Sequence, residues 1–547
     1  MTELSTPDRT IHERQAAQNG PRLTSINPST GEVLGYVPLT DRDGLDAVIR
    51  NARETARVWG LLTTTSRRVY LRQLRQAILN NGEEIARLVV MEQGKTLSEA
   101  YATELIPVLA TLKWLEREGL DLLATRRVSP STPMLGHKRM YERYDPLGVV
   151  ALITPWNYPF SIPVLQIVAA LAAGNAVVLK PSPITPLVGQ KIADLCRQAG
   201  LPAGVVNVVH LRDEDAPALV EHPDVAKVFF TGSVVTGRRV METAARTPKP
   251  VVLELGGKDP AIVAADADLE RAVPGIVWYA LANCGQTCAA VECVYVHRAI
   301  AELFTQRVVE LVRQLRVGDP LDPDTDIGPL TTEEQLQTVE AHVQDAIAQG
   351  ARVLTGGHRL DRPGFFYAPT VLTNVKPSMR IMQEETFGPV IPIVEVETVD
   401  EAVELANRSP FGLTASVWTT SPTLGRDLAV RLRAGAVHVN DHACHWAEPR
   451  AAWGGVRQSG FGRVLGPHGL MEMVNVKFIT EEYRTGAVEA WWYPYNKHVA
   501  SLLADTSRAL YGPLLRRALA LFKLLLNPRT RERVRLSSYL RRPWTWL

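Results

Sequence analysis

The sequence predicts an α/β fold in which parallel sheets are covered by helices. Beyond Gly148, short apolar and β-branched runs alternate with segments of helical periodicity, and this alternation is typical of parallel sheets. A second alternating block extends from Arg271 to about Arg433. The chain has 547 residues, of which 46% are hydrophobic and 22% are charged. It is therefore long and apolar enough to form several domains with large cores.

The first block begins with helical segments and continues as alternating strands and helices. Apolar residues recur at helical spacing between Asp41 and Gln93, which predicts amphipathic helices there. After Gly148, each short apolar run predicts a strand and each longer periodic segment predicts a helix. The expected strands are 149–153, 176–179, 205–209, 227–230 and 251–253, the expected helices are 164–173 and 187–198, and the apolar helical positions are Leu45, Val48, Ile49, Leu71, Leu74, Ile78, Ile85 and Val89.

The segment from Phe230 to Gly237 follows an expected strand and opens an expected helix. Gly232 allows close backbone approach, and Ser233 can cap the helix, whose N-terminus favours a negatively charged group such as a phosphate. An ordinary capped turn has the same features. The GxGxxG fingerprint of dinucleotide-binding folds is missing from the sequence. The turn by itself therefore does not establish a cofactor site.

Two residues where the blocks join could carry covalent catalysis. Cys288 ends the hexapeptide NCGQTC, and Glu254 lies in the hexapeptide LELGGK. A thiol can attack a carbonyl carbon, and a carboxylate can activate the water that releases the product. Neither residue is diagnostic alone, because an isolated cysteine is usually a buried apolar residue. Three further segments accompany the pair, namely 154–159 (TPWNYP), 230–233 (FTGS) and 384–389 (EETFGP).

In this order and at this spacing, the segments resemble the aldehyde dehydrogenase superfamily over about residues 25–480. The resemblance implies a Rossmann-like cofactor domain, an α/β catalytic domain and a small antiparallel oligomerisation extension. It also implies a homodimer or homotetramer that oxidises an aldehyde to the free acid with NAD(P). The implied division is a polar arm (1–24), a cofactor domain (25–258, with 130–147 contributing to the extension), a catalytic domain (259–446), a return segment with an oligomerisation strand (447–484) and a basic C-terminal extension (485–547).

The resemblance assigns catalytic roles to Cys288, Glu254 and Asn157. Cys288 would attack the aldehyde and form a thiohemiacetal, whose oxyanion would be stabilised by the Asn157 amide and the Cys288 N–H. Loss of a hydride would leave a thioester, which Glu254 would hydrolyse by activating water. Branches of the superfamily that release acyl-CoA often lack this glutamate, so its presence favours hydrolysis to the acid.

The cofactor residues are also assigned by resemblance. Lys180 matches a lysine that contacts the adenosine ribose, and Glu385 matches a glutamate that holds the nicotinamide ribose. Many NAD-preferring members carry glutamate where this chain has Pro183, and that carboxylate would repel the 2′-phosphate of NADP. Either NAD or NADP is therefore expected. The complete set is Thr154, Pro155, Trp156, Lys180, Ser182, Pro183, Gly232, Ser233, Gly237, Leu255, Glu385 and Phe387.

The residues that the resemblance places along the substrate tunnel are mostly apolar, which suits an aliphatic or aromatic aldehyde better than a charged one. An aliphatic aldehyde of medium or long chain is the expected substrate. His442, His445 and Arg450 could instead form a basic group that holds a carboxylate, as in a succinate-semialdehyde dehydrogenase, or could face solvent or another subunit. A non-enzymatic structural or binding derivative of the fold is a further alternative. The expected tunnel residues are Tyr158, Ser161, Leu165, Thr287, Ala289 and Trp453.

The five cysteines show no framework spacing, which indicates free thiols in a reducing compartment such as the cytoplasm. Cys284, Cys288 and Cys293 lie close together, but their spacing lacks the paired CxxC pattern of zinc sites. No metal is therefore expected. Cys196 and Cys444, together with Cys284 and Cys293, are interpreted as structural.

The C-terminal extension, 485–547, carries a local charge of +8, although the whole chain carries only +2. So small an overall charge predicts no attraction to nucleic acid. The amphipathic stretch 513–526 is too short to span a bilayer, but its basic and apolar residues suit an interfacial helix. The sequence leaves two interpretations open: peripheral contact with an anionic membrane, and packing on the enzyme surface or at an oligomer contact.

Overall fold

A computed structural model of the chain describes residues 20–483, 489 and 491–528. Contacts among Cα atoms divide the chain into two compact units. The predicted boundary at residue 258 falls inside the larger unit, so this division stays a prediction. The larger unit consists of residues 1–123 and 145–475, and the smaller unit consists of residues 124–144 and 476–547.

The five expected strands of the first block are the five parallel strands of a six-stranded sheet. In order across the sheet, the strands are β17 (Gly460–Phe461), β9 (Val251–Glu254), β8 (Val225–Thr231), β5 (Val149–Ile153), β6 (Ala176–Lys180) and β7 (Val206–Val208). Only β17 is antiparallel to its neighbour, β9. The strand order reverses between β5 and β8, and ligands of such sheets bind beyond the carboxyl ends of the strands at this reversal.

The second block forms a seven-stranded sheet, so the α/β prediction is confirmed for both blocks. In order across the sheet, its strands are β12 (Arg352–Thr355), β13 (Thr370–Thr373), β14 (Val390–Val396), β11 (Val291–His297), β10 (Asp259–Val263), β15 (Thr414–Trp418) and β16 (Ala436–Val439). All neighbours are parallel except β12 and β13. The side chains of β10 and β11 are largely buried, as expected for strands covered on both faces.

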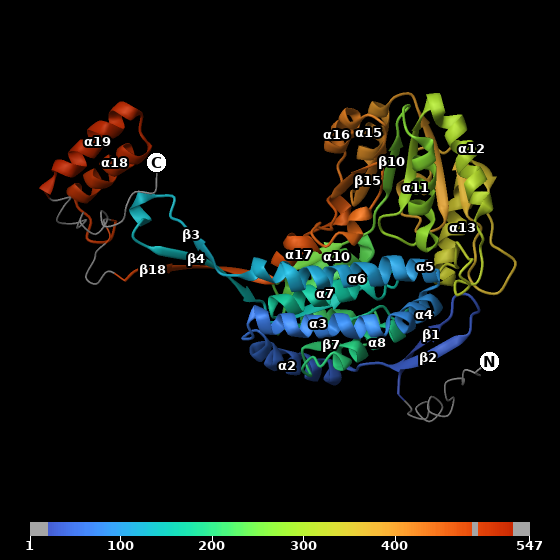
Figure 1. Cartoon of the computed structure of the whole chain (residues 1–547), viewed down its shortest axis with the longest axis horizontal. Helices are drawn as coiled ribbons and strands as arrows, with labels where there is room; N and C mark the ends of the chain where they lie inside the picture. Colours follow the sequence, from blue (N-terminus) through green and yellow to red (C-terminus); the bar gives the residue numbers. More distant parts are fainter. Residues whose placement is uncertain (1–19, 484–488, 490, 529–547) are drawn as a thin grey trace. The chain divides into compact units, whose positions relative to one another are not determined.

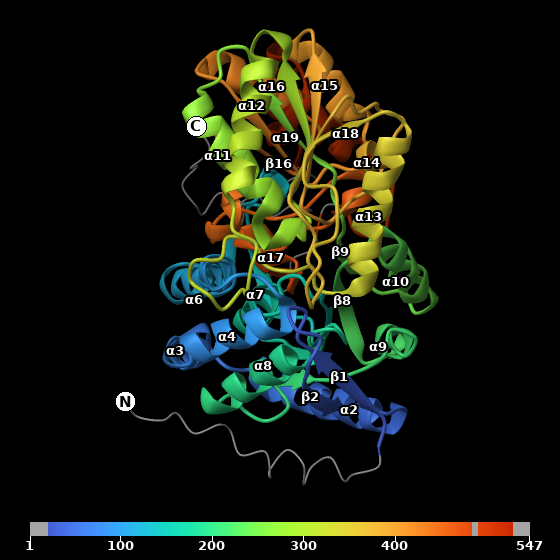
Figure 2. The ribbon, with the colours of Figure 1, turned by 90° about the vertical axis from the view of Figure 1, so that its right-hand side faces the viewer.

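Helices pack around each sheet, and both views of the larger unit separate them into two groups (Figure 1 and Figure 2). The helices around the six-stranded sheet are α2 (Arg42–Trp59), α3 (Thr64–Asn80), α4 (Gly82–Gln93), α5 (Leu97–Glu99), α6 (Ile106–Arg117), α7 (Ser161–Ala173), α8 (Pro186–Gln198), α9 (Ala216–Glu221), α10 (Val234–Arg246) and α17 (Gly466–Met471). Those of the second block are α11 (Leu269–Leu281), α12 (Arg298–Gln314), α13 (Glu333–Ala348), α14 (Arg380–Gln383), α15 (Val399–Arg408) and α16 (Pro422–Arg431).

The predicted apolar faces of the N-terminal helices are confirmed. Leu45 and Ile49 of α2 are buried, as are the five predicted positions of α3 and α4, whereas Val48 is only half-buried. A correction concerns the polar arm, expected to reach residue 24. Strand β1 (Arg22–Ile26) already pairs antiparallel with β2 (Val33–Pro38) from Arg22 onwards, where the Arg22 guanidinium lies 3.9 Å from the centroid of the Tyr36 ring. Residues 1–19 lie outside the described residues.

The smaller unit contains a three-stranded sheet, as the predicted extension requires. Strand β4 (Arg139–Pro146) lies between β18 (Val474–Glu481) and β3 (Arg126–Val128), and β3 and β4 are antiparallel. Two helices follow in sequence and pack against each other, α18 (Lys497–Tyr511) and α19 (Leu514–Leu526) (Figure 1).

Candidate active site

A cavity of about 340 Å³ in the larger unit collects most of the predicted site residues. It lies where the loops after β5 and β8, the end of β9 and the loop before β11 come together. The predicted residues that line it are Pro155, Trp156, Asn157, Tyr158, Leu165, Gly232, Ser233, Glu254, Leu255, Thr287, Cys288, Ala289, Glu385, Phe387 and Trp453. Those that do not line it are Thr154, Ser161, Lys180, Ser182, Pro183 and Gly237.

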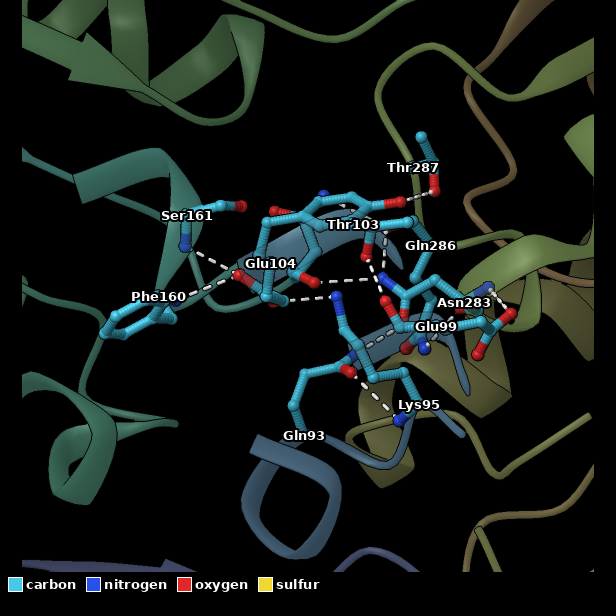
Figure 3. Close-up of polar contacts among 12 residues, drawn as sticks. Gln93, Lys95, Glu99, Thr103, Glu104, Phe160, Ser161, Asn283, Gln286 and Thr287 are labelled. Atoms are coloured by element: carbon cyan, nitrogen blue, oxygen red, sulfur yellow. Dashed lines mark hydrogen bonds and ion pairs between the residues drawn. The ribbon is translucent and has the colours of Figure 1, made fainter. Parts of the chain in front are cut away.

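The loop that carries Cys288 is held by buried side-chain hydrogen bonds (Figure 3). Asn283 has a φ of 57°, in the left-handed region that asparagine tolerates better than most residues. Its N–H donates to the Glu99 carboxylate at 2.7 Å. Its side-chain amide donates to the Asn157 carbonyl at 2.9 Å and to the Gln286 carbonyl at 3.1 Å. Asn283 therefore joins the Cys288 loop to the loop after β5.

The side chain of Asn157 lies beside the same loop. Its amide Nδ2 donates to the Gln286 carbonyl at 3.0 Å, two residues before Cys288. A side-chain amide has two N–H protons, and the other proton can donate to an oxygen in the cavity. The position is suitable for stabilising an oxyanion that develops when Cys288 attacks a carbonyl group.

An ion pair that the sequence did not reveal lies behind this wall of the cavity. Lys95 Nζ and Glu104 Oε1 are 2.8 Å apart and both side chains are buried. Glu104 also accepts hydrogen bonds from the N–H groups of Phe160 and Ser161 at 3.2 and 2.6 Å (Figure 3). Glu104 thus fixes the start of α7. Ser161 was expected to line the substrate tunnel, but it is fully buried at this position and does not reach the cavity.

Tyr158 connects the buried pair with the catalytic loop. Lys95 Nζ lies 3.7 Å from the centroid of the Tyr158 ring, and the Tyr158 hydroxyl lies 2.7 Å from Thr287 Oγ1. Thr287 immediately precedes Cys288. A sequence signal for this region was present in TLSE, where Thr96 and Glu99 form a capping box. The signal identifies a helix start, but it does not indicate proximity to Cys288.

Glu254 has an environment suited to a general base. It ends β9, its carboxylate is buried, and neither oxygen has a hydrogen-bond partner among the described residues. Burial raises the pKa of Glu254 well above its ordinary value, and the neighbouring Arg463 and Trp453 only partly oppose this rise. A carboxylate with a raised pKa binds a proton more strongly, so its deprotonated form is a stronger base.

The turn after Glu254 packs closely against two other parts of the site, the Cys288 loop and the Glu385 side chain. A Cβ atom at Gly257 would lie only 2.5 Å from the Cys288 carbonyl oxygen, and one at Gly256 would overlap the Glu385 carboxylate. The Gly257 N–H donates to Glu385 Oε1 at 3.3 Å. These two glycines allow the β9 turn, the catalytic loop and the Glu385 segment to come together.

The environment of the Cys288 thiol favours its protonated form. Burial raises its pKa well above the ordinary value, and the charges of Glu385 and Glu254 raise it further. The thiolate is the nucleophilic form, so attack requires a neighbouring base that removes the proton. Glu254 lines the same cavity and can accept it.

A second buried ion pair positions the Glu385 segment. Lys258 Nζ lies 2.5 Å from Glu292 Oε2, and Glu292 accepts the N–H groups of Thr386 and Phe387 at 2.8 and 2.9 Å. Burial and the Glu292 charge raise the pKa of Glu385 to about 8. Neither Lys258 nor Glu292 was predicted, because isolated charged residues usually face solvent.

The residues around the cavity fit a dinucleotide at the carboxyl ends of β5 and β8. Ser233 caps α10 by accepting the Thr236 N–H at 3.2 Å, which leaves a helix N-terminus favourable for phosphate. Trp156 and Phe387 form an edge-to-face pair with centroids 5.5 Å apart. Glu385 also lines the cavity.

The remaining predicted cofactor residues lie at the ends of strands, in the turn after β6 or, for Gly237, within α10. The Thr154 N–H donates to the Lys180 carbonyl at 3.2 Å, and Lys180 Nζ pairs with Asp213 at 2.6 Å. Ser182 Oγ accepts the Ile184 N–H at 3.2 Å, next to the half-exposed Pro183. Gly237 serves packing, because a Cβ atom there would lie 2.5 Å from Leu255.

Aromatic rings that the sequence did not indicate line the substrate side of the cavity. Trp446 lies 5.0 Å from Trp453 and 6.2 Å from Tyr158, measured between ring centroids. Trp278 and Tyr279 form another pair at 4.7 Å. These residues come from α11 and from the segment after β16, whose approach to the site depends on tertiary packing. Other unpredicted lining residues include Thr103, Ile162, Val464 and Leu465.

The three residues expected to form a basic group do not form one. Burial lowers the pKa of His442 to about 3 and that of His445 to about 4, so both imidazoles are neutral near pH 7. His445 stacks on Trp453 with centroids 4.6 Å apart. Arg450 is exposed and pairs with Glu118. The hypothesis that these groups hold a substrate carboxylate is therefore corrected.

The other cysteines differ in exposure. Cys196, Cys284 and Cys293 are buried, and burial raises their pKa values. Cys444 is exposed, with Sγ 3.4 Å from His438 Nδ1. The interpretation of these four cysteines as buried structural residues therefore fits Cys196, Cys284 and Cys293, but it does not fit Cys444.

Residues 15–479 match the aldehyde dehydrogenase family. The chain is 37% identical to the peroxisomal aminoaldehyde dehydrogenase 1 of Pisum sativum, covering 87% of this chain and 95% of the relative. It is 38% identical to the 4,4′-diapolycopene aldehyde oxidase of a Methylomonas species, covering 87% and 88%.

Solved structures agree with this match. The chain is similar to an NADP-dependent enzyme of E. coli with a TM-score of 0.82 and 34% identity, covering 85% of this chain and 96% of the other. It is similar to an aldehyde dehydrogenase of Bacillus cereus, solved as an NAD⁺ complex, with a TM-score of 0.81 and 33% identity, covering 88% and 100%. The chain therefore belongs to the aldehyde dehydrogenase family, has its fold, and is an NAD- or NADP-dependent aldehyde dehydrogenase.

Proposed function

We propose that the enzyme oxidises an apolar aldehyde to the free carboxylic acid, with Cys288 as nucleophile and Glu254 as base. The observation that carries the proposal is the presence of Cys288, Glu254 and Asn157 in the lining of one largely apolar cavity. The same observation disfavours the alternative of a non-enzymatic derivative, because such a protein has no need of these three groups together.

The first step is attack of Cys288 on the aldehyde carbon. The S–H proton passes to Glu254, the S–C bond forms, and the carbonyl oxygen becomes an oxyanion that accepts a hydrogen bond from Asn157. NAD or NADP, when bound, accepts the hydride that leaves the aldehyde carbon. Loss of this hydride converts the thiohemiacetal on Cys288 into a thioester.

The second step is hydrolysis of the thioester. Glu254 first releases to solvent the proton that it took from Cys288. It then removes a proton from water, the water oxygen attacks the acyl carbon, and the C–S bond breaks. The products are the carboxylic acid and the Cys288 thiolate. Because neither Glu254 oxygen has a hydrogen-bond partner among the described residues, the carboxylate is available to orient a water molecule.

The residues proposed to hold the cofactor are Pro155, Trp156, Ser233, Leu255, Glu385 and Phe387 around the cavity, with Gly232 in the turn between β8 and α10. Lys180, Ser182 and Pro183 are proposed to form the adenosine end, supported by their position at the carboxyl end of β6. Thr154 and Gly237 are proposed to support the backbone of this site.

Pro183→Glu is expected to lower kcat/KM with NADP by about tenfold or more, because a carboxylate would repel the 2′-phosphate. The value with NAD should fall less. Initial rates with each cofactor measure the effect, and Pro183→Gln is the matched neutral control. If kcat/KM with NADP fell equally in both variants, charge repulsion would not be the cause. The proposal that Pro183 lies at the adenosine end of the site would then be wrong.

The substrate is proposed to be an aliphatic aldehyde of medium or long chain. The apolar cavity supports it, as does the similarity to an enzyme named for the aldehyde of a polyene. An aminoaldehyde is a second candidate. The Trp446 and Trp453 rings, 5.0 Å apart, could bind an ammonium group, and another relative is named for aminoaldehydes. Succinate semialdehyde is not supported, since His442 and His445 are neutral.

For unbranched aldehydes, kcat/KM is expected to rise about fourfold for each added methylene until the cavity is filled, because burial of a CH₂ group is worth about 0.8 kcal/mol. Steady-state rates over a chain-length series measure this slope. An ω-amino aldehyde should react more slowly than the apolar aldehyde of equal length. The reverse order would favour the aminoaldehyde candidate.

A homodimer or homotetramer, a cytoplasmic location and peripheral membrane contact through residues 485–547 are also proposed. The sheet formed by β3, β4 and β18 supports the oligomer, and the five free cysteines support a reducing compartment. No helix among the described residues is long and apolar enough to cross a bilayer. The parts of the proposed membrane contact that fall on residues 485–488, 490 and 529–547 lie outside the described residues.

A further inference from the structure

Helix α19 presents a broad apolar surface in the smaller unit. Leu514, Leu515 and Phe522 are 83%, 79% and 63% exposed, and Leu519, Leu521 and Leu526 are exposed as well. Only Ala520 of this helix is buried, on the side that packs against α18. Single exposed apolar residues are ordinary, but a contiguous set of large apolar side chains on one short helix indicates a surface that contacts another protein or a membrane.

The order of residues around α19 is that of an interfacial helix. With 3.6 residues per turn, the exposed leucines and Phe522 cover an arc of about 160°. Arg516 and Lys523 lie on one border of this arc, and Arg517 lies on the other, where its Nε donates to the Ala509 carbonyl of α18 at 3.3 Å. Basic side chains at the borders of an apolar face can reach lipid headgroups while the face enters the acyl region.

We infer that α19 docks in the plane of an anionic membrane surface, with α18 as the backing helix that holds it. The sequence of α19 contains three basic residues and no acidic one. A second copy seated face to face on this arc would bring the basic borders together without any acidic residue to pair with them. An anionic lipid surface complements both the apolar arc and its charge.

The sequence on either side of α19 agrees with this orientation. Tyr511, at the end of α18 and three residues before Leu514, is 77% exposed, and tyrosine is enriched at the boundary between lipid and water. Residues 529–547 add six arginines and one glutamate to the sequence. The inference deepens the proposed membrane contact and is independent of the proposed substrate and catalytic roles.

Flotation of the full-length enzyme with vesicles tests the inference. The enzyme should float with vesicles of phosphatidylglycerol and phosphatidylcholine, and remain in the soluble fraction with phosphatidylcholine alone at physiological salt. The double substitution Leu519→Glu/Phe522→Glu should lower binding to the anionic vesicles about tenfold or more, because two apolar contacts are lost and two like charges face the lipid. Arg516→Glu/Lys523→Glu should weaken binding at low salt by a similar factor.

Val430→Glu is the matched control, since Val430 is an exposed apolar residue of α16 at 86% exposure. It should bind vesicles as the unsubstituted enzyme does. Oxidation of a short water-soluble aldehyde by every variant verifies the fold and tests the catalytic proposal separately. The inference is overturned if the enzyme stays soluble at low salt, or if the α19 variant floats as well as the control. It is also overturned if light scattering shows that the α19 variant changes oligomeric state while vesicle binding persists.

Discussion

Replacing Cys288 with alanine is expected to lower kcat for aldehyde oxidation by a factor on the order of 10⁴ or more. The substitution removes the atom that forms the bond to the aldehyde carbon, so hydride loss has no thiohemiacetal from which to occur. Binding of NAD or NADP should change little, because Cys288 contributes no charge to the proposed cofactor residues. Cofactor reduction at 340 nm measures the rate, and fluorescence titration measures cofactor binding.

Cys444→Ala is the matched control for this experiment. Cys444 is the exposed thiol and does not line the cavity, so its loss should leave kcat within about twofold, as for most surface substitutions. If the Cys288→Ala enzyme kept more than a small fraction of its activity, or if Cys444→Ala abolished it, the assignment of the nucleophile would be wrong.

Replacing Glu254 with glutamine is expected to slow thioester hydrolysis by about 10²–10⁴-fold. Glutamine keeps the shape of the side chain but cannot accept a proton from water. Hydride loss depends less on this base once the thiolate has formed. The first turnover should therefore appear as a burst of reduced cofactor, followed by a slow steady state. Stopped-flow absorbance at 340 nm resolves the two phases.

The pH profile distinguishes this base from others. Burial raises the pKa of Glu254 well above its ordinary value, so the active, deprotonated form grows only as pH rises through that higher pKa. Hydrolysis by the unsubstituted enzyme should increase over this range, and the increase should vanish in Glu254→Gln. Glu242→Gln, at an exposed position of α10, is the control. An unchanged profile in Glu254→Gln would assign the base to another group.

Most of the fold could be predicted because its strands are strongly apolar. The runs at 149–153 and 176–179 have no polar face, and the structure places them as buried central strands. The capped turn at Ser233 was equally clear, since the cap, the glycine and the following helix lie within a few residues. The start of β1 at Arg22 was missed, because this strand is short and its apolar and polar residues do not alternate clearly.

The candidate site was only partly predictable. Cys288, Glu254 and Asn157 share one cavity, as the resemblance implies, but their roles stay a prediction. The Lys95–Glu104 and Lys258–Glu292 pairs were missed, since nothing in a sequence marks a charge as buried until its partner is known. The error at His442 and His445 has the same cause, because burial, and not residue type, decides whether an imidazole is charged.

The aromatic wall was missed for a geometric reason. Trp278 lies on α11, and Trp446 lies in a segment after β16, more than 150 residues later in the chain. Both residues line the cavity, and this depends on how the chain packs in three dimensions, which residue spacing does not encode. The apolar character of the cavity, by contrast, was already indicated by Leu165, Ala289 and Trp453.

The most direct test of the proposed mechanism is mass spectrometry of the Glu254→Gln enzyme, quenched with acid during turnover of an aldehyde with NAD. The account predicts that the peptide containing Cys288 gains the mass of the acyl group in stoichiometric amount, and that this adduct disappears on treatment with hydroxylamine. An enzyme that turns over under these conditions with no acyl adduct, or with the adduct on another cysteine, would contradict a thioester at Cys288 hydrolysed through Glu254.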